Sequence, residues 1–255
     1  MWSDYLLFAV VGLLPSFIWL LFYLHKDSHP EPKALVLKVF FWGALTGPAA
    51  LILQLGARWL CAPTEDFNFF LATLGQNDFR FILNILLFAP LTEEFLKFFV
   101  VRQTILKNPA FDEPVDAMIY LVVSALGFAA TENLLNIFTA SSLSLNTALS
   151  VAVARFLSAT FLHTLASATL GYFLALSLLN FKKRYLLFAL GFILAFALHS
   201  FYNFLTWYFY YQGNLGNFII AAFVFLVLLG GLVSWQFQQL KKYASVCRLP
   251  FKKRN

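Results

Sequence analysis

The sequence predicts an all-α protein, a polytopic bundle of transmembrane helices. Of its 255 residues, 61% are hydrophobic and only 12% are charged, whereas about a quarter of the residues of a soluble domain are charged. Apolar stretches long enough to cross a bilayer recur along the whole chain, and the alternating pattern of an outer-membrane β-barrel does not occur. No internal repeat or soluble domain is visible, so we expect a single integral membrane domain over residues 1–255.

About seven segments have the length that a ~30 Å hydrocarbon core requires of a helix rising about 1.5 Å per residue. They are residues 5–24, 39–55, 81–101, 117–138, 148–179, 185–208 and 218–237. The N-terminal stretch has no basic leader and no clear small-residue cleavage site. We therefore interpret it as a retained first span rather than a removed signal peptide.

Basic residues lie mainly in alternate loops, and this bias predicts the orientation. Clusters follow the first, third, fifth and seventh predicted spans, while the intervening loops contain only Arg58 and Arg80. The positive-inside rule then places the N-terminus outside and the C-terminus in the cytoplasm. The net charge of +6 has this origin and does not indicate a nucleic-acid partner. Cys61 and Cys247 fall on opposite sides and cannot form a disulfide bond.

Several ionisable side chains lie inside these apolar segments. Each charge at the middle of a span costs about 2.5–3.5 kcal/mol to insert unless it is paired or reaches water. The polar set consists of Glu93, Glu94, Lys97, Glu132, Asn133, Arg155, His163, His199 and Asn203. A purely structural network of ion pairs is one interpretation. We prefer a functional one, because these residue types are unusually reactive.

In the third predicted span, helical spacing places the charged groups on one face. Lys97 follows Glu93 by four residues and Glu94 by three, so it can neutralise one of the two carboxylates. Pro90 is expected to kink the helix and to free the carbonyl of Leu86. A carboxylate pair at such a kink suits a general base that holds a water molecule.

Three further spans contribute polar groups at about the same depth. Glu132 lies in the fourth predicted span, Arg155 and His163 lie two turns apart in the fifth, and His199 and Asn203 are four residues apart in the sixth. At about 1.5 Å per residue, all of them fall near the middle of the bilayer. Four helices can therefore converge on one polar cavity.

Two chemical schemes fit this set of side chains. A divalent metal such as zinc could be held by ligands that include Glu93, His163 and His199, and it would activate a bound water. Alternatively, a glutamate could activate water directly while histidine and asparagine side chains stabilise the oxyanion. The HExxH helix of soluble zinc proteases is absent, so a metal site would have to be assembled from separate spans. We prefer the metal-free scheme.

The segment FDEPVDAM, residues 111–118, is interpreted as a helix start. Pro114 fits the first helical position of the fourth span, with Asp112, Glu113 and Asp116 at the positive end of the helix dipole. A contact with a cytoplasmic substrate or regulator is the less favoured alternative.

The order of these motifs resembles that of the PrsW-type intramembrane proteases. The matching motifs, over about residues 85–206, are EExxK (Glu93, Glu94, Lys97), FDEPVDAMIY, GFAATEN (Glu132, Asn133), His163 and HxxxN (His199, Asn203). That family belongs to a wider clan with the CAAX prenyl endopeptidases and the bacteriocin-processing enzymes. Where the CAAX enzymes carry a second-motif histidine, this chain has Glu132, which fits the PrsW branch.

The resemblance implies an intramembrane endopeptidase with its catalytic core at about residues 81–208. The catalytic residues expected from it are Glu93, Glu94, His163, His199 and Asn203. The supporting residues expected are Lys97, Glu132, Asn133 and Arg155. Members of the family cleave membrane-anchored anti-sigma factors in stress signalling, so the expected partners are a membrane-anchored protein substrate and the lipid bilayer, in a bacterial plasma membrane. The family has been called metallo-type while its relatives use a glutamate mechanism, so the metal question stays open.

Two other functions fit parts of the pattern. Buried glutamate and histidine also mark the ion paths of transporters and proton relays. Such proteins often contain inverted repeats with matching broken helices, whereas this chain shows one proline-kinked helix without a matching partner. A non-catalytic scaffold on the same fold is the least favoured, because every motif residue is present. The sequence does not predict the oligomeric state.

Overall fold

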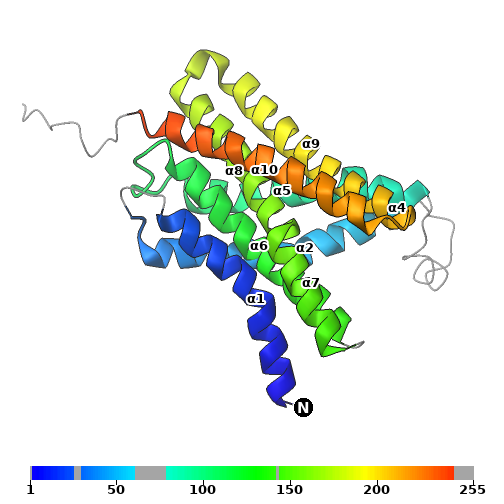
Figure 1. Ribbon diagram of the computed structural model, residues 1–255. Coiled ribbons are helices and arrows are strands. Elements are labelled where there is room, and N and C mark those ends of the chain that lie inside the picture. Colours follow the sequence, from blue (N-terminus) through cyan, green and yellow to red (C-terminus); the bar gives the residue numbers. More distant parts are fainter. Residues whose placement is uncertain (1, 26–29, 61–78, 142–143, 244–255) are drawn as a thin grey trace, which may run out of the picture.

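The computed structural model describes residues 2–25, 30–60, 79–141 and 144–243 (Figure 1). Cys61, Cys247 and most of the loop between the second and third predicted spans lie outside these residues. Every regular element in the described part is helical. In chain order they are α1 (Trp2–His25), α2 (Lys33–Leu60), α4 (Phe79–Leu83), the π-helical segment η1 (Asn84–Phe88), α5 (Ala89–Thr104), α6 (Asp116–Ser141), α7 (Leu145–Leu157), α8 (Ala159–Leu179), the 3₁₀ turn η2 (Phe181–Lys183), α9 (Arg184–Tyr211) and α10 (Leu215–Leu240).

Six helical segments of the described chain are long and apolar enough to cross a membrane, which confirms a polytopic helical membrane protein. They are Tyr5–His25, Lys33–Leu60, Asp116–Ala140, Leu145–Leu179, Phe181–Tyr211 and Leu215–Leu240. The third predicted span, residues 81–101, is not among them. Its sequence is divided between α4, η1 and α5, and the 16 residues of α5 are fewer than the roughly 20 that a full crossing needs. The orientation of the termini stays a prediction.

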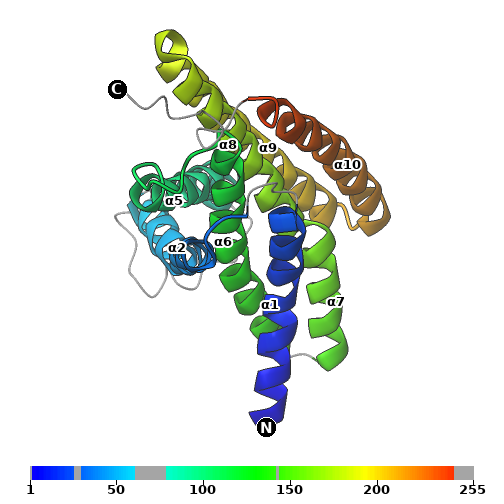
Figure 2. The same cartoon turned by 90° about the vertical axis from the view of Figure 1, so that its left-hand side faces the viewer.

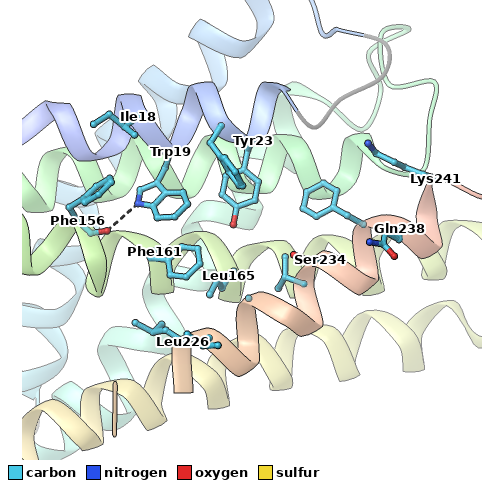
Figure 3. A pocket seen from close by; sticks show the side chains of 15 residues that line it. Ile18, Trp19, Tyr23, Phe156, Phe161, Leu165, Leu226, Ser234, Gln238 and Lys241 are labelled. Atoms are coloured by element: carbon cyan, nitrogen blue, oxygen red, sulfur yellow. Dashed lines mark hydrogen bonds between the residues drawn. The ribbon is translucent and has the colours of Figure 1, made fainter. Parts of the chain in front are cut away.

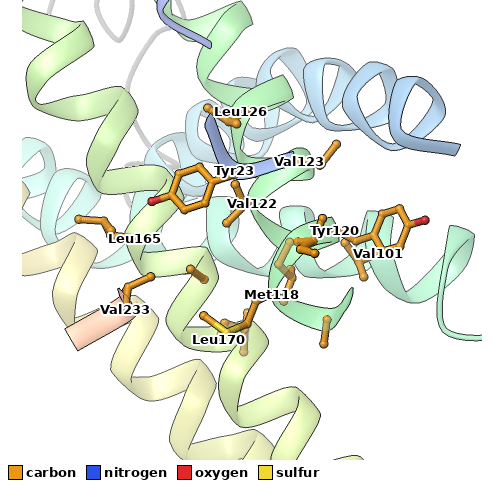
Figure 4. Packing of buried hydrophobic residues seen from close by; sticks show 14 of the residues in the cluster. Tyr23, Val101, Met118, Tyr120, Val122, Val123, Leu126, Leu165, Leu170 and Val233 are labelled. Atoms are coloured by element: carbon orange, nitrogen blue, oxygen red, sulfur yellow. The ribbon is translucent and has the colours of Figure 1, made fainter. Parts of the chain in front are cut away.

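Helix α6 is the centre of the bundle and packs against α1, α2, α5, α7 and α8 (Figures 1 and 2). Its first half is fully buried, and Figure 4 shows Val122 and Leu126 of α6 close to Tyr23 of α1 and Leu165 of α8. The outer helices present large apolar side chains to their surroundings, such as Phe223 on α10, which is 67% exposed. This distribution suits a bundle surrounded by lipid.

Helices α2 and α6 approach one another closely because glycines lie at their crossing. A Cβ atom added to Gly127 of α6 would lie 2.1 Å from the carbonyl oxygen of Phe40, and one added to Gly43 of α2 would lie 2.3 Å from that of Ser124. Small residues allow this backbone contact between membrane helices. The Thr131 hydroxyl also donates to the Ala44 carbonyl at 2.8 Å, so the position of α2 along α6 is well defined.

The fifth predicted span, expected as one helix over residues 148–179, is instead two helices that meet at Ser158. The Ser158 hydroxyl donates to the carbonyl of Ala154 at 2.6 Å, and the indole N–H of Trp19 donates to the carbonyl of Phe156 at 3.1 Å. Side-chain donors thus take carbonyls that an unbroken helix would pair with its own N–H groups, a known cause of helix breaks.

Helix α6 begins at Asp116, two residues later than the expected start at Pro114. The Asp116 carboxylate accepts hydrogen bonds from the backbone N–H groups of Asp112, at 3.0 Å, and Glu113, at 2.8 Å. The acidic segment therefore closes a turn at the start of the helix, which supports its structural interpretation.

Candidate active site

Glu94 of α5 is the centre of a buried polar network. Its side chain is fully buried, and Oε1 accepts from the Lys97 ammonium at 2.8 Å and contacts Nδ1 of His199 at 2.9 Å. Its other oxygen, Oε2, accepts from the Ser167 hydroxyl at 2.9 Å. Three helices, α5, α8 and α9, therefore meet on one carboxylate, and the charge of Glu94 is compensated as buried charges require.

Lys97 connects Glu94 to His163. It is fully buried, and Nζ lies 2.9 Å from Nδ1 of His163. The ring of Phe128 lies below the ammonium, with its centroid 4.5 Å from Nζ. An ammonium group can only donate, so Nδ1 of His163 accepts, and the ring proton is on Nε2.

Glu132 of α6 accepts a hydrogen bond from this Nε2–H group and connects α8 to α7. Its Oε2 lies 2.8 Å from Nε2 of His163 on α8 and 2.8 Å from the guanidinium of Arg155 on α7. Nε of Arg155 donates to Oδ1 of Asn133 at 2.6 Å, and the Asn133 amide donates to the hydroxyl of Thr160 at 3.0 Å. Arg155 and His163 thus meet on one carboxylate, although they belong to separate helices rather than to one continuous span.

Glu93 occupies a different environment from its neighbour Glu94. Successive residues of a helix point about 100° apart, so Glu93 faces α2 and α9. Its Oε1 accepts from the amide of Gln54 at 3.2 Å, and its Oε2 lies 3.7 Å from Nε2 of His199. Among the described residues, Oε2 of Glu93 is buried and has no hydrogen-bond partner. A buried carboxylate oxygen in this condition is where a water or a ligand atom is expected.

A cavity of about 340 Å³ opens directly onto Glu93. It lies between the C-terminal halves of α2 and α9 and the segment from α4 to α5. Both polar and aromatic side chains line it. The lining residues used below are Gln54, Asn84, Glu93, Glu132, Asn203 and Thr206. The sequence-predicted Glu93, Glu132 and Asn203 thus share one cavity, whereas Glu94, Lys97 and His163 lie in the buried network behind it.

The helix next to this cavity is π-helical just before Pro90. The Ala89 N–H donates to the carbonyl of Asn84, five residues earlier. In this register the partner of the Ile85 carbonyl would be Pro90, which has no N–H. The amide of Asn203 donates to the Ile85 carbonyl at 2.9 Å instead. The sequence analysis expected Pro90 to free the carbonyl of Leu86, and the structure shows that the Ile85 carbonyl is left to a side-chain donor.

A larger groove, of about 810 Å³, lies between α1, α8 and α10 (Figure 3). Its walls include Trp19, Tyr23, Phe161 and Leu226, and Lys241 lies at one end. None of the sequence-predicted catalytic residues lines it. In this protein the candidate active site is therefore identified by the polar residues that line the smaller cavity, not by cavity size.

Glu93, His163 and His199 are the candidate ligands of a metal ion, and His163 already uses both of its ring nitrogens in other contacts. Ligand atoms of Glu93, His163 and His199 lie up to 4.8 Å apart, whereas the ligands of a tetrahedral zinc are about 3.4 Å apart, given Zn–N bonds of about 2.1 Å. Oε2 of Glu93 and Nε2 of His199 face one another, but both ring nitrogens of His163 are engaged, by Lys97 and by Glu132. The three residues could therefore hold a metal ion only if His163 gave up its contact with Lys97 or with Glu132.

Sequence reasoning missed Gln54, Ser167 and Thr160, which all contact site residues. For Ser167 a signal exists, since it follows His163 by four residues and therefore shares its helix face. For Gln54 the signal is that it is an uncharged polar residue inside a predicted span. The motifs of the family resemblance do not include it.

A polytopic helical membrane protein with buried carboxylates and histidines around a polar cavity has the makeup of an intramembrane hydrolase. A family model described as PrsW family intramembrane metalloprotease matches residues 31–230. A relative named Protease PrsW from Oceanobacillus iheyensis is 30% identical over 220 residues, which cover 86% of this chain and 88% of the relative. One of the same name from Geobacillus kaustophilus is 32% identical over 187 residues, 72% of each chain.

A third relative, Protease PrsW from Clostridioides difficile, is 27% identical over 207 residues, 79% of each chain. No solved structure is significantly similar to this chain. The match of the family model to most of the chain shows that it belongs to the PrsW family.

Proposed function

We propose that the chain is an intramembrane endopeptidase that hydrolyses peptide bonds of membrane-anchored proteins with Glu93 as the general base. The observation that carries the proposal is the Glu93 carboxylate. Glu93 lines the cavity, and its buried Oε2 has no hydrogen-bond partner among the described residues and lies 3.7 Å from Nε2 of His199. Membership in the family favours a protease over a transporter, a proton relay or a scaffold.

In the proposed reaction, one water donates its protons to Oε2 of Glu93 and Nε2 of His199. Both atoms are acceptors, because Nδ1 of His199 carries the proton that it donates to Glu94. As the water oxygen attacks the peptide carbonyl, its proton passes to Glu93. Glu93 then protonates the amine nitrogen, the C–N bond breaks, and a carboxylic acid and an amine are formed.

The remaining site residues support this step. Asn203 uses one amide N–H on the Ile85 carbonyl, so the second N–H is the proposed donor to the developing oxyanion. Glu94 orients His199. The helices that surround the cavity are held together by a set of further polar residues: Lys97, His163, Glu132, Asn133 and Arg155. Glu94 and His163 are thus assigned to positioning, although the resemblance placed both among the catalytic groups.

The proposed substrate is a membrane-anchored anti-sigma factor, and the proposed location is the bacterial plasma membrane. Both extend the resemblance drawn from the motifs, as does the placement of the family in one clan with the CAAX endopeptidases. A glutamate base without a metal is the mechanism that the donor arrangement supports.

Cleavage of a single-span reporter built from an anti-sigma factor tests the proposal. The full-length protein is reconstituted with the reporter in vesicles, and the products are identified by mass spectrometry. Glu93→Gln and His199→Ala should each lower the rate by at least about 100-fold while the protein stays folded. Ser177→Ala is the control, because Ser177 is buried on α8 and its hydroxyl contacts the Leu174 carbonyl away from the site. Full cleavage by both site variants would refute the assignment.

Metal analysis of the same purified protein tests the choice of mechanism. Without a metal requirement, cleavage continues in the presence of a chelator. One zinc per chain that leaves together with activity, and that restores activity when it is added back, would overturn the metal-free scheme.

A further inference from the structure

Gln54 belongs to α2, which precedes the segment that carries the motifs of the resemblance. We propose that Gln54 is a positioning residue that orients the Glu93 carboxylate for water activation and extends the active site to α2. This inference rests on the proposed function of Glu93.

The pattern of α2 explains why Gln54 points inward. Small or apolar residues recur every three or four positions along one buried stripe of the helix: Val36, Val39, Gly43, Gly47 and Ala50. Gln54 follows Ala50 by four residues and therefore continues the stripe. An amide on the face that packs against other helices, rather than on a lipid face, needs a polar partner.

The glycine contacts set the depth at which this amide lies. Besides Gly43, Gly47 allows close approach, since a Cβ atom there would lie 3.0 Å from the side chain of Thr131 on α6. Because α2 cannot slide along α6 without a clash at these contacts, Gln54 is held two turns beyond Gly47. At that depth it lies beside Glu93.

The contact itself separates the two oxygens of Glu93. The Gln54 amide donates to Oε1 at 3.2 Å, while Oε2 lies 3.7 Å from Nε2 of His199. A neutral donor fixes the rotation of the carboxylate without adding a charge that would compete with the proton of the water. Misplacement of a catalytic group by about 1 Å can cost about 100-fold in rate, so the orientation of this carboxylate matters for kcat.

A structural role alone is the competing explanation, since a polar side chain between membrane helices also holds them together. That role predicts a loss of thermal stability and no specific loss of kcat. Gln54 also lines the cavity, which a residue that only joins helices need not do.

The test compares variants of the full-length protein in vesicles with the same reporter. Gln54→Met keeps the size of the side chain but removes the donor, and it should lower kcat about 10- to 100-fold with KM unchanged. Gln54→His keeps an N–H at similar reach and should recover at least tenfold of that loss. Gln236→Met on α10 is the matched control, because Gln236 is also buried but lies away from Glu93. It should keep the wild-type kcat.

The outcomes distinguish the two proposals. If the wild type does not cleave the reporter, or if Glu93→Gln cleaves it normally, the proposed function fails. If Glu93→Gln is inactive but Gln54→Met keeps full kcat, or if Gln54→His recovers nothing, the role of Gln54 is refuted. Should Gln54→Met not fold, Gln54→Leu replaces it, because its apolar side chain cannot donate to Glu93. Full kcat in Gln54→Leu would refute the inference equally.

Discussion

Lys97 shows how a charge is accommodated inside this bundle. Its side chain is fully buried, and removing an ion from water costs several kcal/mol even in real proteins. The ammonium is compensated by Glu94, by Nδ1 of His163 and by the face of the Phe128 ring. The main effect of Lys97 on stability is therefore that it prevents the cost of leaving the buried Glu94 carboxylate without a cation.

Lys97→Met should lower the free energy of unfolding by about 3 kcal/mol, because it leaves the buried carboxylate of Glu94 without its cation. Unfolding of the purified protein in mild detergent measures the effect. The double variant Glu94→Gln/Lys97→Met should recover at least half of the loss, since the charge and its partner are removed together. A single variant as stable as the wild type would contradict this account of Lys97.

The sequence marked candidate site residues, but it did not predict their separate environments. Insertion cost marks every ionisable residue in a span, and that reasoning found Glu93, Glu94 and Lys97 together. Two adjacent glutamates point in directions about 100° apart, and the sequence does not say which direction leads to the cavity. The positions of the neighbouring helices α2, α8 and α9 decide that Glu94 is enclosed and that Glu93 lines the cavity.

Two helices differ from the regular elements expected from their sequences, and both differences lie beside the site. The π-helical segment before Pro90 exposes the Ile85 carbonyl to Asn203, and the break at Ser158 separates Arg155 from His163. Hydropathy identified both segments correctly as apolar. It could not detect the irregularities, because they also involve hydrogen bonds from Asn203 and Trp19, which are distant in the chain.

The packing of α2 on α6 leads to a prediction about glycine. Gly127→Ala places a methyl group against the Phe40 carbonyl and should destabilise the protein by about 1–3 kcal/mol, the usual cost of overpacking. The same variant should lose activity, because α2 carries Gln54. Gly56→Ala, also on α2 but with open space around its Cβ position, should be neutral or should stabilise by up to about 1 kcal/mol. Thermal unfolding in one detergent compares the two, and equal effects would refute the close contact as the cause.

The whole bundle places the cavity near one end of the membrane-spanning helices. Its lining comes mainly from the C-terminal halves of α2 and α9 and from the segment from α4 to α5, with Glu132 of α6. The charge bias predicts that the ends of α2 and α9 and the start of α4 lie on the outer side. The loop between α5 and α6 lies at the opposite ends of those helices. If the α4–η1–α5 segment crosses the membrane, the cavity and the α5–α6 loop lie on opposite sides of it.

Cysteine labelling in intact cells tests the seven-span orientation. In a background with Cys61→Ser and Cys247→Ser, a membrane-impermeant thiol reagent should label Gln212→Cys, which follows α9, and should not label Asn108→Cys, which follows α5. Permeabilised cells should label both positions and serve as the control. Labelling of Asn108→Cys in intact cells would contradict the seven-span orientation with the N-terminus outside.

The sequence alone determined the class of the protein and marked a set of candidate reactive residues, because both follow from the cost of placing each residue type in hydrocarbon. Composition required a helical membrane bundle, and the buried charges required a shared polar site. Close contacts between helices decided the rest. They fixed which glutamate reaches the cavity, brought Gln54 of α2 to Glu93, and joined Arg155 to Glu132 across a helix break, since such contacts depend on the relative depth and rotation of packed helices and not on the spacing within one segment.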